Sequence, residues 1–242
     1  MKKADNLSIS NKDALIIADV QNDFLPGGAL AIKNGDQVIP AVNEYTKIFK
    51  NANAKIVASM DWHPSKHVSF LQQGGLWPPH CVQNTEGAEF SSKLKLPEGA
   101  VTVSKATNPV KEAYSVFEGT GLAELLKAQG ITRVFVSGLA TDYCVVNSVL
   151  DARKLGFDVV VLMDAIKGID VKPGDVDRAI EAMVKSGATQ MTLADFPEPE
   201  LLIGEESAAE TIGDKPLSHA EVKKTARMRP RGSYKQVRRE RG

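Results

Sequence analysis

Short apolar runs alternate along the chain with segments whose apolar residues recur at helical spacing. Several of these runs are nearly continuous in apolar residues, as is typical of strands buried on both faces of a parallel sheet. The intervening segments end on Gly130, Gly156 and Gly187, which favours helix termination at these positions. The alternation predicts an α/β fold with three layers, α/β/α, built on a doubly wound, mostly parallel six-stranded sheet. The predicted strands are 14–20, 55–61, 101–105, 132–138, 158–165 and 189–196, and the predicted helices are 36–53, 121–130, 142–156 and 174–187.

Two segments depart from this alternation. Residues 62–100 are rich in Trp, His, Pro and Gly, which predicts an extended functional loop. Residues 221–242 hold nine Lys or Arg against two Glu, a net charge of +7, with few large apolar side chains. Because such a segment buries too little apolar surface to offset the entropy of ordering, we expect one folded domain over 1–200 and a charged tail over 201–242.

The basic tail has two interpretations. It either contacts phosphates, as a nucleic-acid-binding or scaffolding segment does, or it is a solvated end that serves solubility or contacts another subunit. The segment has one aromatic residue, Tyr234, and no recognisable nucleic-acid-binding module, so we favour the second interpretation. A nucleic-acid partner is therefore not expected, whereas a homo-oligomer is left open.

Composition narrows the class of protein further. The 242 residues are 43% hydrophobic and 25% charged, with 30 basic and 30 acidic side chains, which is ordinary for a globular protein. No apolar run approaches the roughly 20 residues that span a bilayer, no signal-peptide pattern is seen, and two cysteines do not suggest a disulfide framework. We therefore expect a cytoplasmic protein without a membrane partner. The sequence also lacks a G-x-G-x-x-G motif and a P-loop, so no nucleotide cofactor is expected.

Polar residues follow the ends of four predicted strands. Asp19 ends the first strand, Asp61 the second and Lys105 the third, and the fourth runs into the loop that carries Cys144. In an open parallel sheet, ligands bind beyond the carboxyl ends of the strands, so these groups are expected to meet at one edge. Each has an ordinary alternative, since Asp19 could cap a turn and Lys105 could be a solvated surface lysine.

The loop "SGLATDYCVV" places Cys144 beside a predicted helix start. With Thr141 or Asp142 as the N-cap, the thiol falls in the first helical turn, where the helix dipole favours a thiolate. The free N–H groups there, together with that of Ala140, are suited to hold an oxyanion. Taken alone, this loop is equally compatible with a packed, inert cysteine, because free cysteines are among the most buried residues.

A carboxylate and two imidazoles, those of Asp61, His63 and His80, form a ligand set suited to Zn²⁺, Fe²⁺ or Mn²⁺. His67 is a possible fourth ligand. Three of the four histidines in the chain fall within 63–80, at the carboxyl edge of the predicted sheet. The alternative is that "HPSKH" is a turn with imidazoles facing solvent.

Five segments in order, "IIADVQNDFLPGGAL", "ASMDWHPSKHVSF", "GGLWPPHCVQNTEGAEF", "VSKATNPVKEAYSVF" and "VSGLATDYCVVNSVLDARKLGF", resemble the nicotinamidases within the isochorismatase-like (cysteine hydrolase) family, over roughly residues 12–196. The resemblance implies that Cys144 is the nucleophile, Asp19 the general acid/base and Lys105 the third catalytic residue. It implies a metal, zinc or else manganese or iron, on Asp61, His63 and His80. It further implies a cis peptide between Leu139 and Ala140, an oxyanion hole at Ala140 and Cys144, and a ring pocket lined by Phe24, Leu30, Trp77, Tyr114, Leu139 and Ala140.

The implied reaction is hydrolysis of nicotinamide to nicotinate and ammonia through a thioester, as in NAD salvage, with pyrazinamide as a second substrate. A related amidase acting on a carbamoyl or ureido substrate would share Asp19, Lys105 and Cys144 but need no metal. The intact metal set and Trp77 argue against that alternative, and Cys144 argues against an isochorismatase, which needs no cysteine nucleophile. The chain departs from the usual family pattern at Ala106 and at Glu112-Ala113, next to Lys105.

Overall fold

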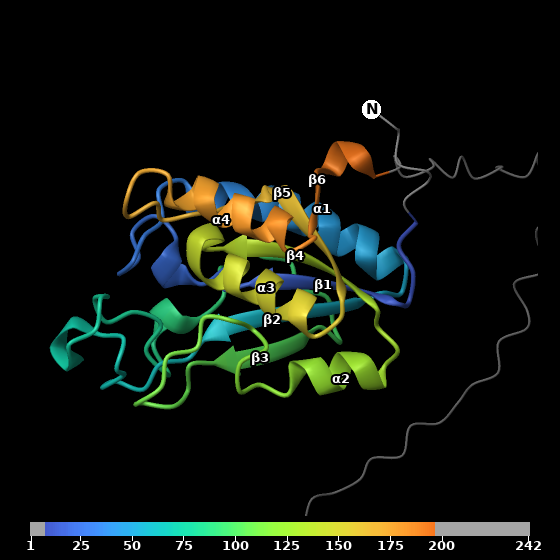
Figure 1. Cartoon of the computed structure of the whole chain (residues 1–242). Coiled ribbons are helices and arrows are strands. Elements are labelled where there is room, and N and C mark those ends of the chain that lie inside the picture. Colours follow the sequence, from blue (N-terminus) through green and yellow to red (C-terminus); the bar gives the residue numbers. More distant parts are fainter. Residues whose placement is uncertain (1–7, 197–242) are drawn as a thin grey trace, which may run out of the picture. The chain divides into compact units, whose positions relative to one another are not determined.

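The computed structural model describes residues 8–196, and the predicted tail over 201–242 lies outside them. A six-stranded, all-parallel sheet runs through this part of the chain in the order β3-β2-β1-β4-β5-β6. Figure 1 shows the helices packed on it. The strands are β1 Asp13–Ala18, β2 Lys55–Asp61, β3 Val101–Lys105, β4 Arg133–Leu139, β5 Asp158–Lys167 and β6 Thr189–Met191, and the helices are α1 Val38–Asn51, α2 Leu122–Ala128, α3 Val146–Lys154 and α4 Asp175–Lys185.

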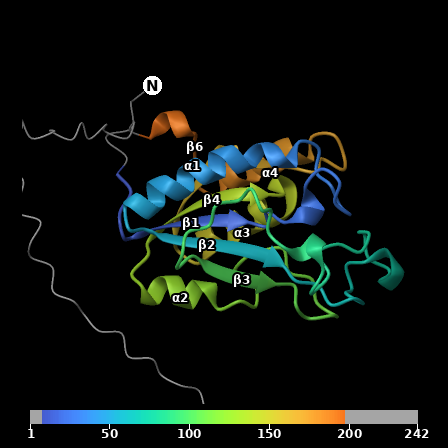
Figure 2. The same ribbon diagram turned by 180° about the vertical axis from the view of Figure 1, so that it is seen from behind.

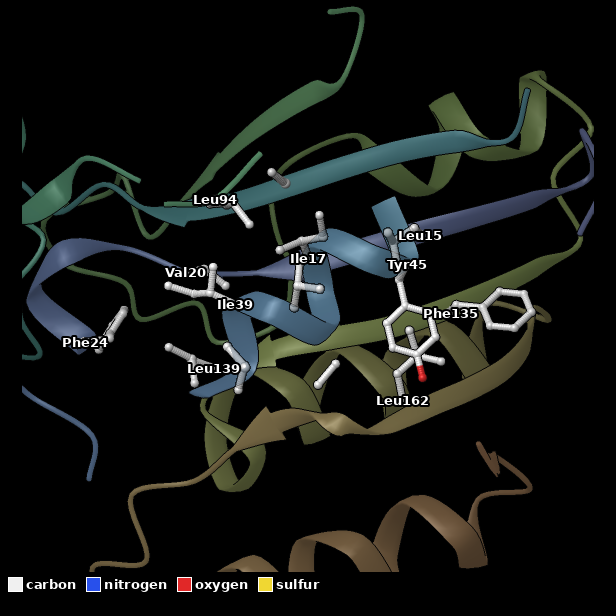
Figure 3. Packing of buried hydrophobic residues seen from close by; sticks show 14 of the residues in the cluster. Leu15, Ile17, Val20, Phe24, Ile39, Tyr45, Leu94, Phe135, Leu139 and Leu162 are labelled. Carbon is white, nitrogen blue, oxygen red and sulfur yellow. The ribbon is translucent and has the colours of Figure 1, made fainter. Parts of the chain in front are cut away.

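Both faces of the sheet are covered, which confirms the three-layer prediction. Alternate residues of β1 point to opposite faces, so Leu15 and Ile17 join one core cluster while Ile16 joins the other. Helix α1 packs on the first face through residues such as Tyr45, as Figure 3 shows. Helices α2, α3 and α4 cover the second face, and Figures 1 and 2 show the sheet between these layers. Every residue of β1 is buried, which explains the unbroken apolar sequence from Ala14 to Ala18.

Most predicted elements are confirmed, with differences at their ends. Strand β1 stops at Ala18 rather than at residue 20, because Asp19 adopts a left-handed conformation with φ of 50° and turns the chain away. The sixth strand is shorter than predicted, since Thr192 caps a short 3₁₀ turn over Leu193–Asp195. The glycines after α2, α3 and α4 have positive φ, as predicted for residues that follow helix ends.

Residues 62–100 form the predicted long connection between β2 and β3, with two short 3₁₀ turns at Leu71–Gln73 and Glu86–Ala88. The connection is tied to the sheet edge, since the amide of Trp62 donates to the carbonyl of Lys105 in β3 and the amide of Ser91 donates to the carbonyl of Val20, just beyond β1. None of the helices within residues 8–196 has the length and apolar character needed to cross a bilayer.

Candidate active site

The ends of β1, β2, β3 and β4 lie side by side at one edge of the sheet. Asp61 and Lys105 are direct partners in the register of β2 and β3. The sheet order reverses between β1 and β4, which is where a doubly wound fold opens a crevice for ligands. Asp19 follows β1 and Cys144 follows β4, so these two side chains flank that point. The structure therefore brings together the four polar residues predicted to meet there.

The carboxylate of Asp19 is completely buried and held from two sides. The Ser59 hydroxyl donates to Asp19 Oδ1 over 2.7 Å, and Lys105 Nζ lies 3.0 Å from Oδ2. Burial raises the pKa of Asp19 above its ordinary value, even though the Lys105 ammonium opposes that rise. The charge on Asp61 adds to the rise. A carboxylate in this condition is a good acceptor for a proton released beside it.

The Lys105 ammonium is the centre of the cluster. Its Nζ lies 2.5 Å from Asp61 Oδ1, 3.3 Å from Cys144 Sγ and 3.3 Å from the carbonyl oxygen of Ala113, in addition to its contact with Asp19. Burial alone would lower the pKa of Lys105, but the two carboxylates outweigh burial and raise it. The lysine is therefore charged at neutral pH and is not the solvated surface residue of the alternative interpretation.

Cys144 lies in a π-helical turn, Thr141–Val145, that precedes α3, and its side chain is buried. The predicted N-caps are wrong. The turn starts after Ala140 with no side-chain cap, and the Asp142 carboxylate instead accepts from the amides of Ile169 and Asp170, at 2.9 and 2.8 Å. Burial raises the pKa of the Cys144 thiol despite the nearby Lys105 ammonium. The helix-start argument for a resting thiolate therefore fails, because burial outweighs it.

Asp61, His63 and His80 lie close together. Their ligand atoms are all within 4.8 Å of one another, and the three side chains are buried. Neither ring nitrogen of His63 has a hydrogen-bond partner among the described residues, which is costly for a buried imidazole unless a ligand satisfies it. His80 donates from Nδ1 to the carbonyl of Pro78 over 2.8 Å, so its Nε2 carries a free lone pair. These features fit a divalent metal ion.

His67 stacks beside this trio, with its ring centroid 4.3 Å from that of His63. A carbonyl oxygen only accepts, so His67 Nε2 must donate to Lys111, 3.1 Å away. Its Nδ1 is then the acceptor for the hydroxyl of Ser69, 2.7 Å away, and for the Ser69 amide. Both nitrogens are engaged, so this arrangement leaves His67 no lone pair for a metal.

The contacts of the predicted ring-pocket residues fall into two groups. The Phe24 ring lies 5.5 Å from that of His80, and Leu30, Leu139 and Ala140 belong to the same core region. In the second group, Trp77 Nε1 donates to the Tyr114 hydroxyl over 3.1 Å. The Leu139–Ala140 peptide is cis, as the resemblance implied.

Sequence reasoning missed three residues that contact the predicted site. Tyr143 packs edge-on against Trp77 at 4.9 Å and against Tyr114 at 5.5 Å. Ser59 bonds to Asp19, and the Gln21 side chain bonds to the backbone of Asp61. A usable signal existed for the last two, because each is a polar residue within or directly after an apolar strand.

Comparison with known proteins decides the family. The model of the isochorismatase domain matches residues 13–195. The chain belongs to the isochorismatase family. The Escherichia coli K12 nicotinamidase is 38% identical over 208 residues, which covers 77% of this chain and 98% of that protein. The zinc complex of the Pyrococcus horikoshii pyrazinamidase is 55% identical, with a TM-score of 0.72 over 75% of this chain and 99% of that one. The protein PnC1 from L. infantum, solved in complex with nicotinate, is 35% identical, with a TM-score of 0.73 over 79% of this chain and 98% of that one.

In this chain, the residues at or just beyond the ends of β1, β3 and β4 bring together a thiol, a carboxylate and an ammonium group. The thiol of Cys144, the carboxylate of Asp19 and the ammonium of Lys105 are in mutual contact at a buried sheet edge. Such a constellation is suited to acyl transfer by a covalent intermediate.

Proposed function

We propose that this member of the isochorismatase family is a metal-dependent amidohydrolase that converts nicotinamide to nicotinate and ammonia, and that also cleaves pyrazinamide. The observation that carries the proposal is one continuous cluster in which Lys105 contacts Asp19, Cys144 and Asp61, so that a nucleophile adjoins a metal-type ligand set. The similar proteins named as nicotinamidase and pyrazinamidase support the substrate class. In a cell, this reaction would serve the salvage of NAD, and a cytoplasmic location suits its free thiols.

The metal would be held by Asp61, His63 and His80, with zinc as the first candidate because the similar pyrazinamidase was solved with zinc. When bound, the ion supplies a Lewis acid for the ring nitrogen of the substrate. The buried ring of Phe24 beside His80, together with the Trp77 and Tyr114 pair, offers apolar and aromatic surface for a pyridine ring. A ring held in this way has its carboxamide fixed relative to Cys144.

The order of proton transfers follows from the electrostatics. The raised pKa of Cys144 keeps the thiol protonated at rest, so Asp19 accepts its proton as the sulfur attacks the carboxamide carbon. Protonated Asp19 then gives this proton to the departing ammonia, and the thioester forms. Asp19 next takes a proton from the attacking water and passes it to the sulfur as the thioester breaks, which releases nicotinate and restores the thiol. Lys105 stays charged throughout and offsets the negative charge that passes between its two neighbours.

The backbone amides of Ala140 and Cys144 are proposed as the oxyanion hole. Ala140 directly precedes the π-helical turn, Cys144 lies within it, and the turn starts directly after the cis peptide of Leu139 and Ala140. Each well-placed donor to an oxyanion stabilises a transition state by about 3 kcal/mol. The small side chain of Ala140 keeps this backbone open to a substrate.

The experiment is a measurement of ammonia release from nicotinamide by the chelated protein before and after zinc is added back. We expect activity to require the metal, to be lost in Cys144→Ala and to persist in Cys81→Ala, which removes the other buried thiol. Turnover by Cys144→Ala would contradict the covalent scheme. A zinc-loaded enzyme that ignores nicotinamide but releases ammonia from a carbamoyl substrate would favour the metal-independent amidase instead.

A further inference from the structure

Gln21 lies two residues after Asp19 and is completely buried. Its carboxamide makes three hydrogen bonds of 2.8 Å. Oε1 accepts from the backbone amide of Asp61, and Nε2 donates to the carbonyl oxygens of Asp61 and Ala88. One side chain therefore satisfies both backbone groups of a predicted metal ligand, 40 residues further along the chain.

The need for such a side chain follows from the geometry of β1. The pairing of β1 with β2 ends at Ala18 and Ser59, because Asp19 turns the chain out of the sheet. Asp61 lies two residues beyond that last pair and has a strand neighbour only on the other side, at Lys105 in β3. A parallel neighbour would have supplied a main-chain acceptor and donor. The Gln21 carboxamide supplies both groups in its place.

We propose that Gln21 is a positioning residue that replaces the missing strand beside Asp61 and thereby sets the place of the Asp61 carboxylate between Lys105 and the metal ion. The inference rests on the proposed metal site. The Asp61 carboxylate has Oδ1 at 2.5 Å from Lys105 Nζ and Oδ2 at 3.7 Å from His63 Nε2. It therefore faces both the Lys105 cluster and the proposed metal ligands. A shift of the Asp61 backbone moves both contacts, because the carboxylate is carried on that backbone.

The third hydrogen bond extends this role to the loop. Ala88 belongs to the short turn at Glu86–Ala88, and the neighbouring segment pairs with the chain around Gln21 through an antiparallel bridge at Phe90. Gln21 thus joins the end of β2, the chain leaving β1 and the far part of the 62–100 connection. The connection carries His63 and His80 and begins directly after Asp61, so all three predicted ligands lie on segments that meet at this junction.

The test compares Gln21→Met with the wild type. Methionine keeps the length of the side chain and removes all three hydrogen bonds. The first readout is zinc affinity, measured by competition with a chromogenic chelator, and the second is the rise in melting temperature that zinc produces. We expect zinc affinity to fall by about 10- to 100-fold, as for other groups that orient metal ligands. In zinc-saturated enzyme, KM should rise more than kcat falls, because a displaced Asp61 weakens binding of the substrate ring more than it affects proton transfer by Asp19.

The matched control is Tyr45→Phe, which removes a 2.7 Å hydrogen bond from a completely buried tyrosine to Asp164 at the other end of the core cluster (Figure 3). This variant should lose thermal stability and keep wild-type zinc affinity within twofold. If Gln21→Met does not fold, Gln21→Glu is measured instead, since it retains an acceptor for the Asp61 amide but no donor. We expect weaker zinc binding there too.

The outcomes separate the inference from the function on which it rests. Wild-type zinc affinity in a folded Gln21 variant would overturn the positioning role alone. A loss of affinity no larger than that of Tyr45→Phe would do the same. A wild-type protein that binds no zinc would overturn the proposed metal site and this inference together.

Discussion

Replacing Lys105 by methionine removes the ammonium at the centre of the site while keeping a side chain of similar length. The substitution leaves two buried carboxylates, those of Asp19 and Asp61, without the cation that touches both. It also takes a positive charge away from Cys144. The structure therefore predicts a loss of stability as well as a loss of activity.

The size of the stability loss follows from the two distances. With an effective dielectric constant of about 20, unit charges separated by the observed 2.5 and 3.0 Å attract by about 6.6 and 5.5 kcal/mol. Much of this gain offsets the cost of burying three charges. Removing one partner of a buried ion pair typically costs about 3–5 kcal/mol, because the remaining charge stays buried without compensation. We expect a loss of this size at pH 7 in Lys105→Met.

The loss must also depend on pH in a definite direction. In the wild type, the pKa of Asp61 is lowered and that of Asp19 is raised. In Lys105→Met, both pKa values rise above those of the unfolded chain, so the folded protein takes up protons at higher pH than the unfolded chain does. Stability contributed by a raised pKa is present at low pH and is lost as pH rises. The variant should therefore recover stability relative to the wild type between about pH 7 and pH 5.

The assay is urea unfolding followed by circular dichroism at both pH values, with a chelator present so that no metal compensates for the charge of Asp61. Lys47→Met serves as the matched control, since Lys47 forms an exposed ion pair with Glu44 and should change stability little. A loss below about 1 kcal/mol at pH 7 would refute the reasoning, because it is smaller than one shifted pKa unit. An equal loss at pH 5 and pH 7 would also refute it.

Three further predictions concern single side chains. His67→Asn should retain zinc in equilibrium dialysis, whereas His63→Asn should lose it, because both nitrogens of His67 already have partners; parallel loss in the two variants would make His67 a ligand. Asp19→Asn should abolish ammonia release and yet speed alkylation of Cys144 by iodoacetamide at pH 7, since the Asp19 charge raises the thiol pKa; slower alkylation, read by peptide mapping, would contradict this sign. Ser59→Ala should move the acid limb of the kcat/KM profile to higher pH, because the Ser59 hydrogen bond holds the pKa of Asp19 down and its removal lets that pKa rise. The control is Ser137→Ala, which removes a buried serine hydrogen bond to the carbonyl of Ile16 and should leave the profile in place.

The fold could be predicted from the sequence, because strands buried on both faces of a sheet appear as nearly continuous apolar runs. Strands β2 and β3 match their predicted ranges, and each ends on a polar residue of the candidate site, Asp61 or Lys105. The ends of β1 and β6 could not be predicted from the sequence. Asp19 leaves the sheet through a left-handed backbone conformation, and Thr192 starts a capped turn, and neither choice changes the apolar pattern around it.

The residues of the candidate site could be predicted where the topology alone brings them close together. Parallel strands bring their carboxyl ends to one edge, so Asp19, Lys105 and Cys144 could be grouped before any distance was known. The state of the thiol could not be derived in this way. Its position near a helix start predicted a low pKa, but burial raises that pKa, and burial depends on packing by segments far apart in the chain.

The two carboxylates of the cluster show what the structure adds to the residue list. Asp19 and Asp61 are both buried, and both touch Lys105. For Asp19, burial raises the pKa and the like charge of Asp61 adds to that rise, while Lys105 and Ser59 oppose it too weakly to reverse it. For Asp61, burial acts in the same direction, but the closer Lys105 ammonium and His63 outweigh it and lower the pKa. When their environments shift the pKa values of two acids in opposite directions, the two acids can take different roles. The separation supports Asp19 as the group that exchanges protons with Cys144 and Asp61 as the permanent anion that anchors Lys105 on one side and the metal on the other.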